Sequence, residues 1–480
     1  MPMLRFLSTP RSAGDRLSRR EWLRIGGLAG LAGLGAGGKA AQGGEASQPQ
    51  IPGFGKARSV ILVYASGGQS QLELWDPKPS APAEIRGEFA AISTAVPGTF
   101  LGEHMPKLAK LADRYAIVRS LSHADLDHGS AGYLALTGRY HSRRSSNPPP
   151  RPSDEPTYGA LLKRVRPTHR FPYEAIHLNG PALVPELVGP GQDGGFLGRE
   201  FEPLVLGDVS RGPVAVAGLD PQDEVPGVRL AARQSLKAAV DAYCRRFEDN
   251  RQMRDMNQHY AQAFELLASP RSRAAFDLSA EPEAIRERYG RNRSGQACLL
   301  ARRLVEAGVP WITVIWSHSN RGQDTAPNDT DQYGWDTHND IFEALKIRLL
   351  PRFDQGFSAL LEDLEARGLL DETLVVCMGE FGRAPLVALE RKFAGATPGR
   401  KHWASVYSAV LAGAGVSGGL VYGQSDKIAA HPVSDRVGPW DVAATMFSAL
   451  GIDPATHYAD SLGRPFPITV GSPIKGLYQS

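Results

Sequence analysis

Residues 59–70 read SVILVYASGGQS, an unbroken apolar run that ends abruptly in a polar, glycine-rich turn. A short continuous apolar run bounded by turn residues is typical of a strand buried on both faces, as in a parallel sheet covered by helices. Gly67 and Gly68 permit a close approach of the backbone to a ligand. The stretch therefore predicts a central strand with a ligand-facing loop at its carboxyl end.

Apolar runs of strand length recur along the chain. They are 116–121 (AIVRSL), 173–178 (YEAIHL), 311–317 (WITVIWS), 373–379 (TLVVCMG) and 407–413 (YSAVLAG). Helical periodicity lies between the last three, most clearly at 341–367, where an apolar stripe continues despite Pro351. This alternation predicts an α/β fold with a largely parallel sheet covered by helices.

The charge balance gives no support to a nucleic-acid partner. The net charge is +3, but the first 44 residues contain seven basic residues against two acidic ones, so the rest of the chain, with 47 basic and 49 acidic residues, is near neutral. Cys244, Cys298 and Cys377 lie far apart and show neither zinc-site spacing nor a disulfide framework. We therefore expect buried thiols.

The N-terminal residues have the features of an export signal. SRREWLRIGG (18–27) resembles the twin-arginine export signal, and the apolar stretch behind it, 28–38, is too short to span a bilayer. We therefore predict a signal peptide and spacer at 1–44 and a folded domain at 45–480. The mature chain should be periplasmic or extracellular, without a transmembrane segment. A basic amphipathic leader, or a chance pair of arginines, is the alternative.

Two segments of the domain differ in composition from the rest. Residues 141–157 (HSRRSSNPPPRPSDEPT) are rich in Pro, Ser and Arg and predict an exposed loop. Residues 228–306 show helical periodicity and predict an insertion or a segment that covers the sheet. The helical segment contains no compelling site.

Polar residues lie in the loops next to the predicted strands. After strands come Ser66, His123, Asp125, His128, His318, Asp336, His338, Glu380 and Arg383, and just before the strand 407–413 come Lys401 and His402. Ligands of such sheets collect at the carboxyl ends of the strands. Imidazole and carboxylate together bind zinc, manganese and similar ions, so the shared edge predicts a metal site. Taken alone, each loop histidine is as compatible with a structural or solvated role.

Several stretches resemble the DUF1501 family of exported proteins, within the alkaline phosphatase/sulfatase-like superfamily. Among them are SGGQSQLELWDPKP (66–79), RSLSHADLDHGSAGYLALTG (119–138), GWDTHND (334–340), RGLLDETLVVCMGEFGRAP (367–385) and GRKHW (399–403). The resemblance implies an alkaline phosphatase-like α/β/α sandwich with a central mostly parallel sheet. It also implies divalent ions, with a Ser, Thr or modified Cys nucleophile at a helix N-terminus that favours an anionic ester.

The nucleophile position departs from that pattern. In sulfatases the nucleophile lies ten residues before the glycine of a helix end that resembles LLTGRY, and counting back from Gly138 reaches His128. Neither a hydroxyl nor a thiol stands there, and Ser130 is the nearby hydroxyl. The small residues 129–132 are expected to keep backbone amides open to an anion or a metal.

The metal-ligand positions also differ in part from the family's pattern. Ser66 stands where active members usually have a metal-binding Asp, and Glu380-Phe381 replaces an expected Asp-His pair. Gln71 and Glu73 stand where His and Asp are common in the family.

The other metal site matches the family better. Asp336, His338 and His402 match its ligands well. The resemblance thus implies one retained metal site and a second site, which carried the nucleophile, that has been rebuilt or lost.

Two functions follow. The first is an exported metal-dependent hydrolase of anionic esters, sulfate or phosphate, with small-molecule or glycan substrates and a metal-bound water in place of a covalent nucleophile. The ion would be zinc, calcium or manganese. The second is a non-catalytic exported binding module on a degenerate sulfatase-like fold.

The hydrolase hypothesis gives each candidate residue a role. Asp336, His338 and His402 hold the ion, with Glu380 as a fourth ligand or a base. His128 is a general acid or base, or a further ligand, and Ser130 is the replacement nucleophile. The substrate anion is bound by Arg383, Lys401 and the turn at Ser66.

Overall fold

The computed structural model describes residues 51–478, apart from 169, 185, 213, 215–268, 318–333 and 461. Residues 51–480 form one compact unit. The predicted signal peptide, 1–44, lies outside the described residues. So do His318, Cys244 and the first part of the predicted helical segment 228–306.

An eight-stranded sheet forms the centre of the molecule, in the order β12-β4-β11-β8-β1-β7-β5-β6. Its strands are β1 (Ser59–Tyr64), β4 (Tyr115–Leu121), β5 (Ala175–Leu178), β6 (Leu204–Leu206), β7 (Trp311–Ile315), β8 (Thr373–Met378), β11 (Tyr407–Ala412) and β12 (Val421–Tyr422). Every neighbouring pair is parallel except those of β11, which runs antiparallel to β4 and β8. The predicted strands and the mostly parallel sheet are confirmed.

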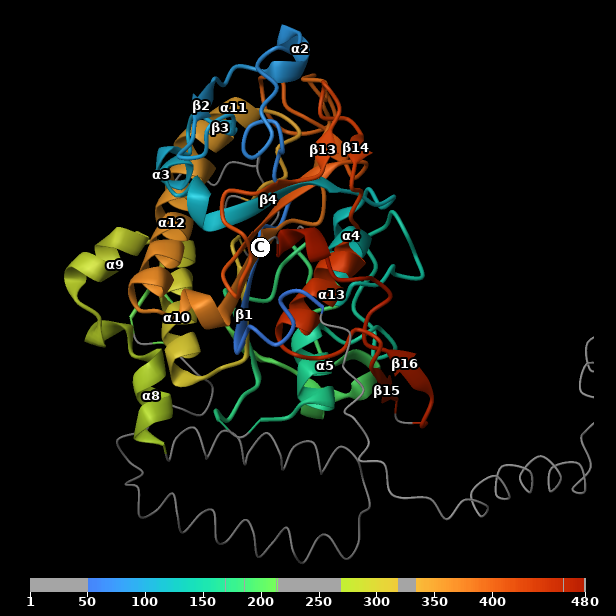
Figure 1. Cartoon of the computed structure of the whole chain (residues 1–480). Coiled ribbons are helices and arrows are strands. Elements are labelled where there is room, and N and C mark those ends of the chain that lie inside the picture. The colour runs from blue at the N-terminus through green and yellow to red at the C-terminus, as the bar shows by residue number, and fades with distance from the viewer. Residues whose placement is uncertain are drawn as a thin grey trace, which may run out of the picture. The chain divides into compact units, whose positions relative to one another are not determined.

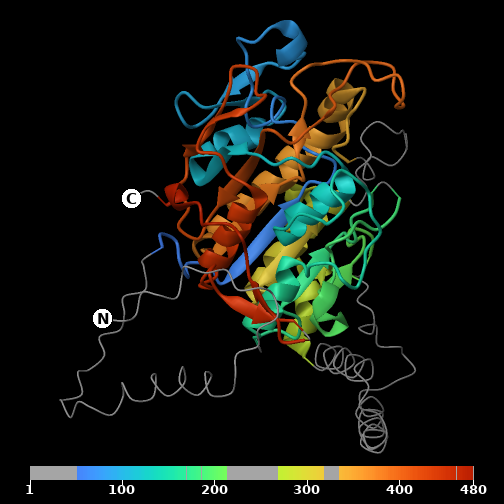
Figure 2. The same cartoon turned by 90° about the vertical axis from the view of Figure 1, so that its right-hand side faces the viewer.

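Helices cover both faces of this sheet (Figures 1 and 2). One layer holds α3 (Pro106–Lys110), α8 (Pro270–Phe276), α9 (Glu283–Tyr289), α10 (Arg293–Ala307) and α12 (Leu350–Ala366). The other holds α4 (His128–Thr137), α5 (Tyr158–Val165) and α13 (Pro439–Ala449). Alternate residues of β1 enter two separate cores, Ile61 and Val63 on the first side and Val60 and Leu62 on the second. This is the predicted α/β/α sandwich.

The helical pattern at 341–367 is interrupted where the sequence contains Pro351. α11 (Ile341–Glu343) passes into a π-helical turn (Ala344–Leu349) before α12 begins. Proline lacks the N–H of a helix interior, but the first turn of a helix needs no such donor. The new start of α12 therefore accommodates Pro351 while the apolar stripe stays buried.

Short elements lie outside the main layers. They are α2 (Ala83–Arg86), β2 (Ala91–Ser93) with β3 (Phe100–Gly102), β9 (Gly382–Arg383) with β10 (His402–Trp403), β13 (Gln424–Ser425) with β14 (Pro432–Ser434), and β15 (His457–Ala459) with β16 (Pro465–Pro467). Residues 141–157 form no helix or strand and are mostly exposed. Among the described residues, no helix has the length and apolarity needed to cross a membrane.

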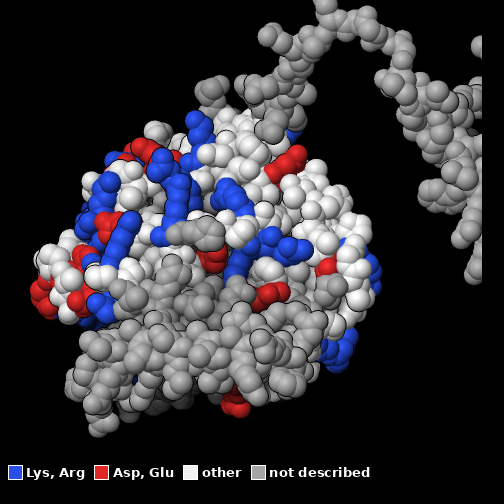
Figure 3. Space-filling model, turned by 90° about the horizontal axis from the view of Figure 1, so that it is seen from below, with Lys and Arg blue, Asp and Glu red and all other residues white. Residues whose placement is uncertain are grey.

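The amino-terminal edge of the sheet carries ordinary surface charge. A pocket of about 340 Å³ there is lined by Arg58, Arg170, Arg271, Glu306 and Glu372, among others. Arg58 pairs with Glu372 at 3.0 Å, and both side chains are exposed. Figure 3 looks onto the end of the molecule where α8 lies and shows Lys and Arg interspersed with Asp and Glu.

Candidate metal centre

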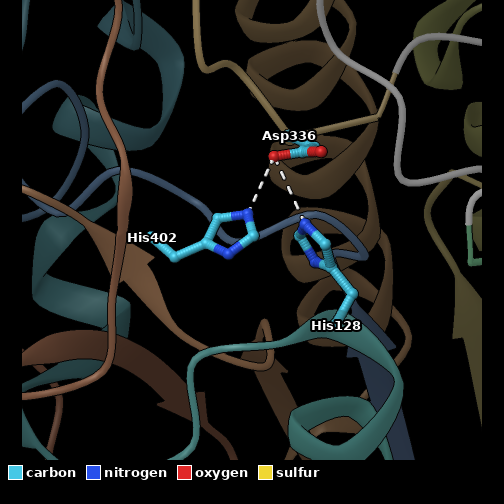
Figure 4. A group of neighbouring side chains, drawn as sticks. All are labelled: His128, Asp336 and His402. Carbon is cyan, nitrogen blue, oxygen red and sulfur yellow. Dashed lines mark hydrogen bonds and ion pairs between the residues drawn. The ribbon is translucent and has the colours of Figure 1, made fainter. Parts of the chain in front are cut away.

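Four side chains converge at the carboxyl edge of the sheet. His128 is the first residue of α4, Asp336 and His338 lie in the loop between β7 and α11, and His402 lies in β10. The Nε2 atoms of the three histidines each lie 3.2 Å from Oδ1 of Asp336. The Nε2 atoms of His338 and His402 are 2.9 Å apart. Figure 4 shows His128 and His402 approaching Asp336 from different elements.

The second ring nitrogen of each histidine is held by an oxygen. The Nδ1 contacts are His128 to Glu380 Oε1 (2.6 Å), His338 to Glu390 Oε2 (3.0 Å) and His402 to the carbonyl of Leu126 (2.7 Å). Ionised carboxylate and carbonyl oxygens only accept hydrogen bonds, so each Nδ1 carries the hydrogen. In its neutral form each imidazole then presents a bare Nε2 to the others.

This arrangement lacks a positive partner at its centre. Bare nitrogens at 2.9 Å, beside a carboxylate oxygen, repel one another unless a proton or a cation lies among them. The Nε2 of His128 is buried, and its 3.2 Å contact with Asp336 Oδ1 does not have the geometry of a good hydrogen bond. A buried polar atom that is poorly satisfied in this way indicates a missing ligand or proton.

The donor set fits a divalent transition metal. One ligand atom each from His128, Asp336 and His402 lies within 4.8 Å of the others. Ligands of a tetrahedral zinc ion lie about 3.3 Å from one another, close to the separations found here. Histidines that bind metals donate their other N–H to a carboxylate or carbonyl, as all three do here. Calcium, which prefers six or more oxygens, fits this nitrogen-rich set poorly.

The pKa values show how the metal-free cluster is charged. Burial alone lowers the pKa of His128, but Asp336 and Glu380 outweigh it and raise that pKa to about 9. Burial and the nearby His128 lower the pKa of His402 to about 4. Burial acts to raise the pKa of Asp336, but His128 and Arg383 hold it well below its usual range. Without a metal, one proton on His128 takes the place of a cation.

Glu380 lies behind His128. Its Oε1 also accepts a hydrogen bond from the Gly67 amide at 2.7 Å, and its main-chain carbonyl lies 2.6 Å from Nε2 of His123. Its Oε2 is buried without a partner among the described residues. The structure thus places Glu380 as the residue that orients His128, whereas the sequence pattern suggested a fourth ligand or a base.

Arg383 is fully buried beside Asp336. Its Nη2 lies 2.8 Å from Oδ1 of Asp336 and also donates to the Gly67 carbonyl. The other nitrogens donate to the carbonyls of Gly68 and Arg400. The guanidinium is therefore engaged within the protein, which differs from the predicted role in binding a substrate anion.

Lys401 lies at the surface beside Glu390. Its side chain is 63% exposed, and its Nζ lies 2.6 Å from Oε1 of Glu390. Because Glu390 also holds His338, Lys401 is coupled indirectly to the cluster.

The two candidate serines have other partners. Ser130 donates to Asp125 at 2.7 Å and accepts from the Ser146 amide. Ser66 is buried, and its hydroxyl bonds to Tyr64. No contact between either hydroxyl and the histidine cluster occurs among the described residues.

The amides at the start of α4 are occupied, contrary to expectation. The Gly129 amide donates to Oδ1 of Asn147 at 2.7 Å, and the Ser130 amide donates to the Ser146 carbonyl. The Pro-rich loop 141–157 therefore caps this helix and leaves those amides closed to an anion.

A second buried polar cluster lies next to the metal-site candidates. Gln71 bonds through its side chain to the main-chain N–H and C=O of Arg383, at 3.0 and 2.8 Å. Glu73 pairs with Arg400, and both side chains are fully buried. The residues at the family's His and Asp positions are thus used to hold loops together.

Sequence reasoning missed Glu390 and the Leu126 carbonyl. Glu390 lies in a charged loop without periodicity, and a carbonyl leaves no sequence signal. Only the rule that a metal-binding histidine needs an outer acceptor would have prompted a search for them.

The fold and the histidine cluster define an α/β protein with a candidate metal centre at the carboxyl edge of its sheet. The chain belongs to the DUF1501 family, described as a protein of unknown function, whose model matches residues 57–478. A comparison with curated proteins returns no match.

Solved structures with a similar arrangement come from the superfamily expected from the sequence. The phosphonate monoester hydrolase SpPMH from Silicibacter pomeroyi is 13% identical, with a TM-score of 0.40 over 88% of this chain and 76% of that chain. The PsFucS1 sulfatase from Pseudoalteromonas sp. is 15% identical, with a TM-score of 0.36 over 91% and 72%. An alkaline phosphatase superfamily protein from Vibrio parahaemolyticus is 11% identical, with a TM-score of 0.38 over 84% and 71%. Likeness at this level carries no argument about activity.

Proposed function

We propose that this protein is a metal-dependent hydrolase of anionic esters, sulfate or phosphate, with zinc or manganese as its ion. The observation that supports the proposal is the convergence of three imidazole nitrogens on Asp336 Oδ1, each ring fixed at Nδ1. Asp336, His338 and His402 would hold the ion. When bound, such an ion polarises an ester oxygen and lowers the pKa of a water molecule into the neutral range.

The protein groups around the cluster restrict its geometry in advance. Arg383 fixes Asp336, Glu390 fixes His338, and the Leu126 carbonyl fixes His402. Such outer contacts favour ion binding because little side-chain entropy is then lost. The His402 side chain is 18% exposed, against 12% for Asp336 and 6% for His128 and His338, so His402 is the most accessible member of the cluster.

Water is the attacking group in this proposal, because no side-chain nucleophile contacts the cluster among the described residues. His128 faces the cluster through Nε2 and is held at Nδ1 by Glu380. In the metal-free protein, Asp336 and Glu380 outweigh burial and raise the pKa of His128 to about 9. We assign His128 the role of the acid that delivers a proton to the leaving oxygen.

The expected setting is outside the cytoplasm. The twin-arginine pattern at 18–27 supports export of the folded protein to the periplasm or beyond. The proposed substrates are therefore esters that occur outside the cytoplasm, on glycans or on small molecules. The near-neutral charge of the domain supports neither a nucleic-acid substrate nor a nucleic-acid partner.

A second candidate function is a binding module without catalysis. One observation favours it: His128 Nε2 lies as close to Asp336 as the other two histidines do. If His128 is a fourth ligand, the tetrahedral set is closed, and closed zinc sites are usually structural. The occupied amides at the start of α4 point the same way.

One set of assays separates these functions. The purified mature chain, loaded with zinc or manganese, would be tested on aryl sulfate and aryl phosphate esters with and without a chelator. We expect hydrolysis that the chelator abolishes. A metal-loaded protein that hydrolyses neither ester would overturn the hydrolase proposal and favour the binding module.

A His128→Gln variant tests the role of His128. If His128 is the acid, the variant keeps its metal affinity and loses at least about a hundredfold in kcat. A comparable loss in metal affinity would instead make His128 a ligand. His457→Ala, which removes an exposed histidine outside both the cluster and its neighbouring pocket, is the matched control.

A further inference from the structure

A polar pocket lies beside the candidate metal centre. It has a volume of about 500 Å³ and is formed by the loop after β4 and by the segment 431–436, which includes β14. Its lining includes Ser122, His123, Ser405 and Arg436. In sheets of this type, ligands bind at the carboxyl ends of the strands, where this pocket lies.

His123 connects the pocket to the metal centre. Its Nε2 lies 2.6 Å from the carbonyl of Glu380, the residue whose side chain orients His128. Its own amide donates to the carbonyl of Ala404, two residues beyond His402. The wall of the pocket therefore includes a residue, His123, that is bonded to the main chain of Glu380 behind the cluster.

Arg436 is the basic side chain of this pocket, whose lining also includes the exposed carboxylate of Asp435. Its side chain is exposed, and no carboxylate partner for its guanidinium occurs among the described residues. Its charge is felt at His123, whose pKa is lowered mainly by burial and in part by Arg436. A guanidinium without an internal partner is available to bind an anion through paired hydrogen bonds.

The backbone on both sides of Arg436 is fixed. The carbonyl of Asp435 accepts a hydrogen bond from Ser120 Oγ at 2.6 Å. The Val437 amide donates to the Ser120 carbonyl, and its own carbonyl accepts from the Ser122 amide. The backbone around Arg436 is thus held by hydrogen bonds to the end of β4, which favours a defined binding geometry.

The rest of the lining is suited to a hydroxyl-bearing ligand. Three of its side chains are serine hydroxyls, those of Ser122, Ser405 and Ser434, and His431 adds an imidazole. Trp403, which follows His402, is not part of the lining but lies against His431, with the two ring centroids 5.8 Å apart. Serine hydroxyls and an imidazole can form hydrogen bonds with the hydroxyl groups of a sugar.

We propose that this pocket binds the sugar part of the substrate, and that Arg436 recognises a second anionic group on it. The position of the pocket beside the ester rests on the proposed function, whereas the binding of an anionic sugar does not. The substrate class is then a sugar that carries more than one sulfate or phosphate group. Arg436 is a specificity residue in this proposal and takes no part in bond breaking.

The test uses metal-free protein, so that binding is measured without the candidate metal centre. The probes are N-acetylglucosamine 6-sulfate and unsulfated N-acetylglucosamine, titrated by calorimetry or followed by NMR. We expect the Arg436→Ala variant to bind the sulfated sugar about tenfold more weakly, the usual effect of losing a hydrogen bond to a charged group. Arg436→Lys should recover part of that loss. The unsulfated sugar should bind the wild type and the Arg436→Ala variant equally.

Arg170→Ala is the matched control, because it removes an exposed arginine of the pocket at the opposite edge of the sheet. Equal weakening by Arg170→Ala would show a non-specific charge effect and overturn the proposal. An Arg436→Ala variant that binds like the wild type would overturn it too, as would a wild type that binds no sulfated sugar. The hydrolase proposal fails in a different assay, by absence of metal-dependent turnover.

Discussion

Two buried polar clusters lie side by side in this protein, and they differ in how their atoms are satisfied. In the first, Arg400 donates to Glu73 and to the carbonyls of Ala384, Pro385 and Ile85. In the second, three imidazole nitrogens meet one carboxylate oxygen without a cation among them, apart from the guanidinium of Arg383 on the outer side.

The difference separates a structural cluster from a ligand site. A buried network whose donors and acceptors are all paired holds loops in place and needs nothing more. A cluster that presents several lone pairs to one point is incomplete by itself. Both clusters pair an arginine with a carboxylate in a mostly buried setting, so the unpaired imidazole lone pairs of the second cluster are what indicate a metal.

The largest effect is expected in the structural cluster. Glu73→Gln leaves the buried Arg400 charge without its carboxylate, and breaking a buried pair costs about 3–5 kcal/mol. Urea unfolding would measure the loss, which should be the same with and without metal. Glu372→Gln, at the exposed pair with Arg58, is the control and should cost less than about 1 kcal/mol. Equal losses in the two variants would contradict the account.

The next effect is a pH dependence of the metal-free protein. Asp336 and Glu380 outweigh burial and raise the pKa of His128 from 6.5 to about 9, so the folded state holds this proton more tightly than the unfolded state. That stabilisation is complete below pH 6.5 and is lost as the pH rises through about 9. By the usual conversion the loss is about 3 kcal/mol. Unfolding experiments across this range would show it, and His128→Gln should remove the slope. A variant with the same slope would show that another group titrates.

His402→Ala should weaken zinc binding by about a hundredfold or more, because it removes a ligand and not merely an outer contact. The metal-free protein should lose little stability, since the variant also relieves the close approach to His338. Competition with a chromogenic chelator would measure the affinity. Unchanged zinc affinity would place the ion elsewhere.

Glu390→Gln should have the smallest effect, a loss of about tenfold in zinc affinity. It keeps the size of the side chain but weakens the acceptor that fixes the ring of His338. Lys401→Ala is the control, because Lys401 contacts Glu390 and not the histidine. If Lys401→Ala lowered the affinity more than Glu390→Gln, surface charge rather than ring orientation would be the cause.

The sequence was sufficient to predict the scaffold because strand residues leave a local signal. The apolar runs 59–65 and 373–379 became β1 and β8, and the loops after such strands contain His128, Asp336 and the other candidates. Parallel strands bring those loops to one edge, so their proximity followed from the fold class.

Contacts made by main-chain atoms and irregular loops could not be predicted in this way. Glu390 reaches His338 from a loop without periodicity, and the carbonyl of Leu126 has no side-chain signature. The loop 141–157 was expected to be merely exposed, yet its Ser146 and Asn147 occupy the first amides of α4. Arg383 was expected to bind substrate, and only its burial shows that its donors are engaged inside the protein.

The most direct test of the metal centre is the zinc content of the purified domain after incubation with zinc and removal of the excess, measured by mass spectrometry. We expect one zinc ion per wild-type chain and none in the Asp336→Ala/His338→Ala double variant, with circular dichroism to verify that the variant is folded. A wild type that retains no zinc, or a folded double variant that retains as much as the wild type, would contradict this expectation.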